Sequence, residues 1–371
     1  MAGLGQTRTG PLAGVRIVEF AGLGPAPFCT MLLADMGADV LRIDRPGQSP
    51  HPADVVWRGR RSLELDLKQP GDVALCLAAI DKADVVIEGF RPGVMEKLGL
   101  GPDDVFARNP RIVYGRMTGW GQDGPLAQAA GHDINYIALT GALAAIGGAD
   151  GPPSPPLNLV GDFGGGALYL AMGIAAALFE RASSGQGQVI DAAIVDGTAS
   201  LMSFFQGIVA MGMTEMERSR SLLAGQAPYY GCYACADGKY VSVGPLEPQF
   251  FDRFVALLEL DPADFKRRHD ASMWPDARAR IADALSRRTR AEWCVLMEGS
   301  DACFAPVLEL HEAPEHPHMI ARGIYVEQAG VVQAGPAPRF SRTPAQISAA
   351  PCPAGEGGVQ LLAEWGVPAK D

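Results

Sequence analysis

Short apolar runs and longer amphipathic segments alternate along the first part of the chain. Runs rich in Val, Ile and Leu that are bounded by Gly, Pro or charged residues are typical of strands, whereas apolar residues spaced three and four apart are typical of helices. Strands are predicted at residues 15–20, 38–44, 62–67, 83–90 and 111–117. Helices are predicted at residues 27–36, 70–82 and 93–98. Because strands that alternate with helices form parallel sheets, we expect a doubly wound, Rossmann-like α/β domain.

From residue 132 onward the pattern changes to long apolar helices and then to shorter elements. The expected elements are helices at 133–146, from Asp162 to about 179 and at 192–213, a hairpin at 231–244 that turns at Asp237-Gly238, charged helices within 249–316, and short strands with one helix near 358–365. With 371 residues the chain exceeds one ordinary core. We expect a large α/β domain at 1–200, linker helices at 201–229, a small α+β domain at 230–320, and a return to the large domain at 321–371.

The apolar stretch that follows Asp162 is the longest uncharged run, from Phe163 to Phe179. Seventeen residues lie at the lower edge of the length that spans a membrane, and Glu180 and Arg181 follow at once. We therefore expect a buried core helix and no membrane association.

Charge and cysteine content narrow the function further. The net charge of −11 argues against nucleic acid or an anionic membrane surface as the main partner. Residues 1–14 have no apolar stretch typical of a secretory leader. The seven cysteines are odd in number and spread over the chain, so we expect free thiols in a reducing, cytoplasmic location.

Cations follow the predicted strands of this acidic chain. They are Arg45, Lys68 and Arg91 after the second, third and fourth strands, and a cluster formed by Arg58, Arg60 and Arg61. Ligands of open α/β sheets bind at the carboxyl ends of the strands, and Arg binds phosphate through two parallel hydrogen bonds. This rim therefore predicts a phosphate-bearing ligand; the alternative is a set of solvated loop charges.

The loop after the first strand contains Gly22 and Gly24, two thirds of a dinucleotide fingerprint. Pro27 occupies the place of the third glycine, and Asp44 ends the second strand. The motif is weak even when it is complete, so binding of NAD or FAD is a minor alternative.

Two candidate bases precede two apolar helices. His132 stands before the helix predicted at 133–146, where a helix N-terminus favours the neutral imidazole that accepts a proton. Asp162 precedes Gly164, Gly165 and Gly166, which lower helix stability and suit a close approach of ligand to backbone. Free N–H groups in that first turn would stabilise a developing oxyanion. Taken singly, each residue is also explained as an ordinary cap or a hydrogen-bonded structural residue.

Other candidate sites are weaker. Cys232-x-x-Cys235 has no second ligand pair at zinc spacing, and the histidines of HEAPEHPH do not form HExxH. No GxSxG occurs, which argues against a serine hydrolase with that nucleophile. We expect no metal.

Several stretches together resemble the family III CoA-transferase superfamily, most closely its branch of racemases for 2-methylacyl-CoA thioesters. The most specific are GHDINY and NLVGDFGGG; others are PLAGVRIVEFAGLGPAPF, ADVLRIDRPG, DVVIEGFRPGVMEKLGLGP and PAPRFSRTPA. The resemblance runs from residue 11 to about 345. It implies a proton transfer between two bases, His132 and Asp162, through an enolate. It also implies that Glu247 orients His132, and that no cofactor is needed because CoA is part of the substrate.

The resemblance further implies where CoA binds and how the chain assembles. The CoA-binding residues would be Arg45, Leu65, Asp66, Leu67, Lys68, Gly89, Phe90, Arg91, Lys97, Gly131, Asp133, Ile134, Asn135 and Tyr136. Proteins of this family form interlocked homodimers, with each site between the large domain of one chain and the small domain of the other.

Three alternatives remain open at this point. A family III CoA transferase would use Asp162 as a covalent carrier of acyl and then CoA, and would have no need of His132 as a second base. An idle CoA-binding protein would catalyse no solvent exchange, and a nicotinamide oxidoreductase would bind NAD. Branched fatty acyl, bile-acid and arylpropionyl groups all fit an apolar acyl site.

Overall fold

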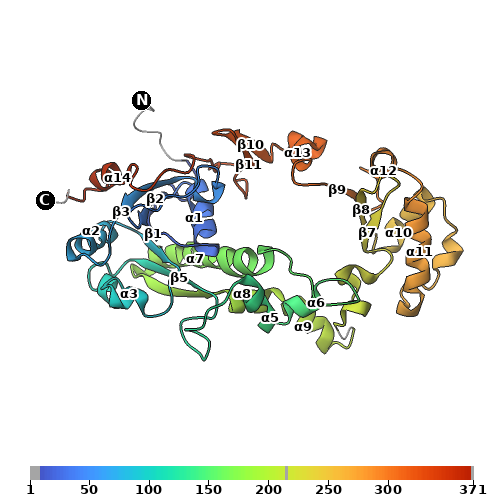
Figure 1. Ribbon diagram of the computed structural model, residues 1–371, viewed down its shortest axis with the longest axis horizontal. Coiled ribbons are helices and arrows are strands. Elements are labelled where there is room, and N and C mark those ends of the chain that lie inside the picture. Colours follow the sequence, from blue (N-terminus) through green and yellow to red (C-terminus); the bar gives the residue numbers. More distant parts are fainter. Residues whose placement is uncertain (1–8, 214–215, 369–371) are drawn as a thin grey trace. The chain divides into compact units, whose positions relative to one another are not determined.

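The computed structural model describes residues 9–213 and 216–368 (Figure 1). The chain divides into two compact units. Unit 1 comprises the chain up to Thr140, Leu157–Leu201 and the chain from Arg322, and unit 2 comprises Gly141–Pro156 and Met202–Ala321. Residues 141–156 thus belong to unit 2, although the sequence suggested the large domain. The outer ends of the predicted domains, residues 1–8 and 369–371, lie outside the described residues.

A six-stranded sheet forms the centre of unit 1. Its strands are β1 (Arg16–Phe20), β2 (Asp39–Asp44), β3 (Arg60–Glu64), β4 (Val85–Glu88), β5 (Val113–Thr118) and β6 (Gln188–Ala193). They are all parallel and lie in the order β3-β2-β1-β4-β5-β6. This order reverses direction between β1 and β4, which is the arrangement of a doubly wound α/β sheet. The predicted fold class is therefore confirmed.

Helices cover both faces of this sheet. On one face, α1 (Pro25–Asp35) and α7 (Leu168–Ser184) bury side chains such as Leu33 and Ile174 against Val40 and Val113. The other face is covered by α2 (Pro70–Ile80), α3 (Val94–Lys97), α4 (Pro102–Phe106) and α14 (Gly358–Glu364). Because neither face meets solvent, most of the buried strand residues are apolar, although β3 also carries Arg60 and Arg61.

Three predicted helices differ from the structure. The helix expected at 133–146 breaks into α5 (Asp133–Leu139) and α6 (Ala142–Ala145), because Gly141 adopts a φ of 82°. The helix expected at 192–213 is the end of β6, then α8 (Ile194–Leu201) and α9 (Ser203–Ala210). The helix expected from Asp162 begins earlier, as a wide-turned π-helical segment, η2 (Leu159–Ala167), that continues into α7.

Strand β6 is the strand of the large sheet that the sequence prediction missed. Its residues Gln188 to Asp191 are exposed or half-buried, and only Ala192 and Ala193 are fully buried. An edge strand with small buried residues lacks the apolar run by which most other strands were predicted. Helix α4 and the strand at residues 304–307 were not predicted either.

Unit 2 has a smaller mixed core. Strands β7 (Gly231–Ala234), β8 (Tyr240–Val243) and β9 (Phe304–Val307) form an antiparallel sheet, and the predicted hairpin with its Asp237-Gly238 turn is confirmed. Helices α10 (Pro248–Leu257), α11 (Trp274–Leu285) and α12 (Arg290–Met297) pack on it around Phe254, Ile281 and Trp293.

Short elements complete the chain. They are α13 (Pro317–Ala321), the hairpin of β10 (Tyr325–Gln328) and β11 (Val331–Ala334), the 3₁₀ turns η1 (Val55–Trp57), η3 (Arg218–Arg220), η5 (Pro262–Phe265), η6 (Ala271–Met273) and η7 (Ala313–Glu315), and the π-helical turn η4 (Leu222–Gln226).

The long apolar helix is only partly buried, which corrects the expectation of a core helix. The stretch Leu159–Ser184 has a mean hydropathy of 1.4 over its most apolar window, enough in length and composition to cross a membrane, and a third of that window is buried. Leu168, Met172 and Phe179 lie on one exposed side, with Phe179 81% exposed. The opposite side packs on β5 and β6 through Leu170 and Ile174.

Candidate active site

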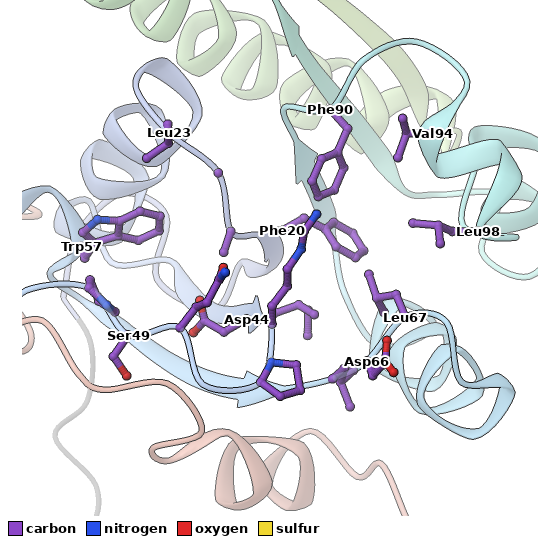
Figure 2. A pocket seen from close by; sticks show the side chains of 18 of the residues that line it. Phe20, Leu23, Asp44, Ser49, Trp57, Asp66, Leu67, Phe90, Val94 and Leu98 are labelled. Atoms are coloured by element: carbon purple, nitrogen blue, oxygen red, sulfur yellow. The ribbon is translucent and has the colours of Figure 1, made fainter.

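Two adjoining cavities open in unit 1 beside the carboxyl ends of its strands, where an α/β sheet binds ligands. The first has a volume of about 870 Å³ and is lined by the loops that follow β1, β2, β3 and β4 (Figure 2). Its lining includes Phe20, Asp44, Arg45, Trp57, Leu67 and Lys68. This cavity is mainly apolar, with two cations of the predicted rim at its edge.

The second cavity contains both candidate bases. It has a volume of about 440 Å³, and His132, Asp133, Tyr136 and Asp162 all line it. His132 and Asp162 are separated by 30 positions in the sequence, and α5 and η2 bring them to one site.

Leu23 and Phe90 line both cavities and therefore mark the passage between them. Figure 2 shows both side chains at the same end of the first cavity. The Phe90 ring packs edge-on against Phe20 with 6.3 Å between ring centroids, whereas Leu23 is 91% exposed. A long, thin ligand that occupied both cavities would pass between these two side chains.

His132 is the residue immediately before α5, at its N-cap. Its backbone N–H donates to Oδ1 of Asn135, 3.0 Å away, so Asn135 closes the first turn of the helix. The Gly131 position before it is enclosed by the rings of Trp120 and Tyr136, which pack edge-to-face 4.7 Å apart. The Tyr136 hydroxyl also donates to the Gly131 carbonyl. The backbone that carries the imidazole is thus held on both sides.

Asp162 lies in the first turn of η2 and is half-buried. Burial raises the pKa of this carboxyl, the nearby Asp133 carboxylate raises it further, and a hydrogen bond from Asn158 and the neighbouring His132 lower it in part. A carboxyl whose pKa lies above the ordinary range gives up and takes back a proton more readily near neutral pH, which suits a general acid and base.

The backbone N–H of Asp162 is already occupied. It donates to Oδ1 of Asp133 across 2.6 Å. The prediction that Asp162 is an N-cap whose first-turn N–H groups stay free is wrong for this amide, because η2 begins three residues earlier and α5 places Asp133 beside it.

The glycines after Asp162 serve helix packing, which corrects the expectation that they admit a ligand. A Cβ on Gly165 would stand 2.4 Å from the Thr198 hydroxyl, and a Cβ on Gly197 would stand 1.8 Å from the Gly165 carbonyl oxygen. A Cβ on Gly166 would meet Ile194 at 3.0 Å. Helices η2 and α8 therefore approach so closely that only glycine fits between them.

The predicted CoA-binding residues fall into three groups. Arg45, Leu65, Asp66, Leu67, Lys68 and Phe90 line the first cavity. Gly89, Phe90, Arg91, Gly131, Asp133 and Tyr136 line the second. Lys97, Ile134 and Asn135 are exposed and line neither cavity.

Sequence reasoning missed several lining residues, among them Phe20, Leu23, Trp57, Val94, Leu98 and Trp120. Most of them stand at or just after the end of a predicted strand or in the helix that follows, whereas Trp57 lies farther along the chain in η1. Apolar residues there are indistinguishable from core residues without the fold.

The arginine cluster WRGRRS is structural, which corrects its assignment to a phosphate site. Arg60 is buried against Glu19 at 2.6 Å, Arg58 is buried against Asp35 at 2.5 Å, and Arg61 pairs with Asp39 at 3.2 Å. A buried arginine requires such a partner, since an unpaired buried charge is strongly destabilising.

Asp44 stands where a dinucleotide-binding protein would hold ribose, but its carboxylate is already hydrogen-bonded within the protein. Its Oδ2 accepts hydrogen bonds from Arg42 at 2.6 Å and from the Ser62 hydroxyl. Only 4% of the residue is exposed. Because this carboxylate is not free to bind a ribose hydroxyl, the structure argues against a nicotinamide oxidoreductase.

Glu247 belongs to unit 2. It is the residue before α10, and its side chain is exposed. Its pairing with His132 stays a prediction. Within residues 9–213 and 216–368, no group of three or more His, Cys, Asp or Glu side chains is arranged to hold a metal ion.

Known proteins are similar to this chain over most of its length. The family described as CoA-transferase family III matches residues 12–357. Alpha-methylacyl-CoA racemase of Mus musculus is 45% identical over 357 residues, covering 96% of this chain and 93% of the relative. Acetyl-CoA:oxalate CoA-transferase of Acetobacter aceti is 31% identical over 348 residues, covering 88% of each. The crystal structure of a CAIB/BAIF family protein from Brucella suis has a TM-score of 0.82 at 25% identity, covering 96% of this chain and 100% of that one.

Proposed function

The chain belongs to CoA-transferase family III, and we propose that it interconverts (R)- and (S)-2-methylacyl-CoA thioesters by proton transfer between His132 and Asp162. The observation that carries this proposal is that two proton-transfer groups of different type line one cavity. The 45% identity to a racemase supports racemase chemistry for the chain, while the family also contains CoA-transferases.

The chemistry requires two bases on opposite faces of one carbon. One base takes the α-proton, the C–H electron pair forms the carbon–carbon double bond of an enolate, and the thioester oxygen takes the negative charge. The other base then delivers a proton to the opposite face, and the carbonyl re-forms with inverted configuration. A thioester suits this path because sulfur donates weakly into the carbonyl, which leaves the α-proton more acidic than in an ester.

Both groups meet the requirements of general acid–base catalysis. His132 carries an imidazole, the side chain that most often serves as a general acid or base. Burial and the Asp133 carboxylate raise the pKa of Asp162, which eases proton uptake by that carboxyl. A pair in which either member starts as base and the other as acid runs the reaction in both directions.

The two cavities match the two ends of a CoA thioester. In this proposal the nucleotide occupies the first cavity beside Arg45 and Lys68, the pantetheine arm passes between Leu23 and Phe90, and the thioester reaches the second cavity. The CoA part thereby supplies binding energy that positions the reacting carbon.

Solvent exchange tests the proposal. Purified protein in D₂O should incorporate deuterium at the α-carbon of 2-methylacyl-CoA starting from either epimer, measured by mass spectrometry or NMR. If neither epimer exchanged while CoA moved between carboxylic acids, the racemase proposal would fail.

That second outcome would support CoA transfer. A transferase needs Asp162 as nucleophile, first acylated and then carrying CoA. The presence of His132 in the same cavity favours proton transfer, because a transferase has no need of a second base.

We also propose that the protein is a homodimer, as the family resemblance implies. The exposed side of α7, with Leu168, Met172 and Phe179, is an apolar surface that a second copy would cover. In such an assembly Glu247 of one chain would orient His132 of the other by accepting a hydrogen bond from its second ring nitrogen.

A further inference from the structure

Asp133 was expected to contact CoA, but its carboxylate is engaged with the protein. Oδ1 accepts the hydrogen bond from the Asp162 backbone N–H at 2.6 Å, a short distance typical of a charged acceptor. Asp133 is also the residue directly after His132 in the chain. One side chain thus connects the backbone positions of the two bases.

The residue before Asp162 is shaped for this contact. A Cβ on Gly161 would stand 2.3 Å from Oδ1 of Asp133 and 2.8 Å from Cγ2 of Ile137. Only glycine therefore allows the carboxylate to reach the amide. Gly161 itself is buried, so the contact lies in an enclosed part of the site.

We propose that Asp133 is a positioning residue: it sets the spacing of the two bases by holding the Asp162 amide with a carboxylate that lies beside the Asp162 side chain. This proposal rests on the proposed racemase function. It concerns no contact of Asp133 with substrate.

Of the charged residues near Asp162, Asp133 has the largest effect on the pKa of its carboxyl. Asp133 and His132 act on the Asp162 carboxyl, and Asn158 donates a hydrogen bond to it. Burial and then Asp162 raise the pKa of Tyr136 in turn. The loop before α1 places the uncharged Gly24 against the Asp162 carboxylate, and Arg91 lines the same cavity. Ile194, Gly197 and Thr198 of α8 and Met117 of β5, which lie against η2, are not titratable.

Two substitutions separate the hydrogen bond from the charge. Asp133→Asn keeps an oxygen that can accept from the amide but removes the charge, so kcat should stay within about threefold of wild type at alkaline pH, while the acid limb of the kcat profile moves to lower pH. Asp133→Ala removes both, so kcat should fall about 100-fold with KM changed less than about threefold, because misplacement of a catalytic group by about 1 Å has that effect.

Amide hydrogen exchange reports on the hydrogen bond between the Asp162 amide and Asp133 independently of catalysis. In substrate-free protein, the Asp162 amide should be protected in wild type and in Asp133→Asn, and should exchange faster in Asp133→Ala. Gly161→Ala should expose the same amide and lower kcat although Asp133 is present, since its methyl group displaces the carboxylate.

Matched controls exclude general damage. Asp104→Asn removes one exposed carboxylate on α4, and Gly207→Ala adds a methyl group with no atom within 4 Å. Both should match wild type in kcat and amide exchange, and circular dichroism should show all variants folded.

Three results would contradict a positioning role for Asp133. Unchanged amide exchange in Asp133→Ala, an unmoved acid limb in Asp133→Asn, or a rise in KM with kcat preserved in Asp133→Ala would each overturn the positioning role. If wild type itself failed to exchange the α-proton, the racemase proposal would fall, while amide exchange would still report on the bond.

Discussion

Gly24 lies directly against the carboxylate of Asp162. A Cβ at position 24 would stand 3.2 Å from Oδ2 of that carboxylate, and Gly24 adopts a φ of 72°, which L-residues rarely adopt. The loop that looked like part of a dinucleotide fingerprint is therefore one wall of the cavity that holds both candidate bases.

Gly24→Ala should lower both stability and activity. The positive φ costs roughly 1–2 kcal/mol for an alanine, and the new methyl group crowds the base, so kcat should fall roughly tenfold or more. Gly99→Ala is the matched control, because Gly99 has a φ of 68° with no atom within 4 Å of its Cβ position. It should lose similar stability in urea unfolding and keep its kcat; an equal kcat in Gly24→Ala would show that Asp162 tolerates the contact.

Loss of either base should stop racemisation but leave proton exchange with one of the two epimers. In His132→Ala and Asp162→Ala the remaining base can still take the proton that faces it, so deuterium exchange should persist from one epimer and vanish from the other. Racemisation should fall at least about 10²–10⁴-fold in both, the usual contribution of a general acid or base. Full racemase activity in either variant would remove that residue from the pair.

Asp162→Asn should make the protein more stable at neutral and alkaline pH while it abolishes racemisation. Burial and Asp133 raise the pKa of Asp162 in the folded state, so the folded protein binds this proton more tightly than the unfolded chain does. Stability therefore falls as pH rises from the unfolded pKa through the folded pKa, and above that interval the ionised carboxylate is destabilising. Asparagine avoids this cost, and Tm should rise by roughly 1–3 °C.

Thermal unfolding at several pH values tests the direction of the pKa shift of Asp162. The difference in Tm between Asp162→Asn and wild type should shrink toward zero well below pH 4, because an unfolded Asp has a pKa of about 3.9 and the carboxyl is then protonated in both states. A wild type that is more stable than the variant at pH 8 would contradict the direction of the pKa shift.

Arg45→Ala should weaken binding of the CoA part without slowing the chemistry. The side chain lines the first cavity, and loss of a charged hydrogen bond costs about 1.5–3 kcal/mol, so KM should rise roughly 10- to 100-fold with kcat nearly unchanged. A pantetheine thioester without the nucleotide should be handled equally by Arg45→Ala and wild type. Lys82 is an exposed cation just before β4, at the amino ends of the strands and therefore away from the cavity. Lys82→Ala should leave KM unchanged. An unchanged KM in Arg45→Ala would assign the nucleotide elsewhere.

The exposed face of α7 should be buried in a dimer. Sedimentation velocity without detergent should show a species of twice the chain mass, and Phe179→Asp should shift it toward monomer, because a buried carboxylate at the interface is costly. Val295→Asp, which changes an apolar residue of α12 that is 90% exposed, is the control and should stay dimeric. Binding of wild type to lipid vesicles in place of dimerisation would favour a membrane as the partner of this helix.

The sequence by itself determined the fold class, the positions of five of the six sheet strands, and the two candidate bases. Strands β1, β2, β4 and β5 were predictable because a parallel sheet that is covered on both faces needs apolar runs, and these are visible in one dimension. Strand β3 overlaps the predicted range of 62–67 only in part. GHDINY and NLVGDFGGG pointed to His132 and Asp162 because a titratable residue stands before a predicted apolar helix in each.

The tertiary structure alone decided how those residues are used. Arg58 and Arg60 are cations in the sequence, yet their partners Asp35 and Glu19 lie far away along the chain, so their burial and pairing depend on the fold. Gly165 and Gly197 are separated by 32 positions, and their role in packing exists only where η2 meets α8. The hydrogen bond from Asp162 to Asp133 has the same origin. Local periodicity reports the burial of one segment, whereas the contacts that tune a site join segments whose distance only the folded chain defines.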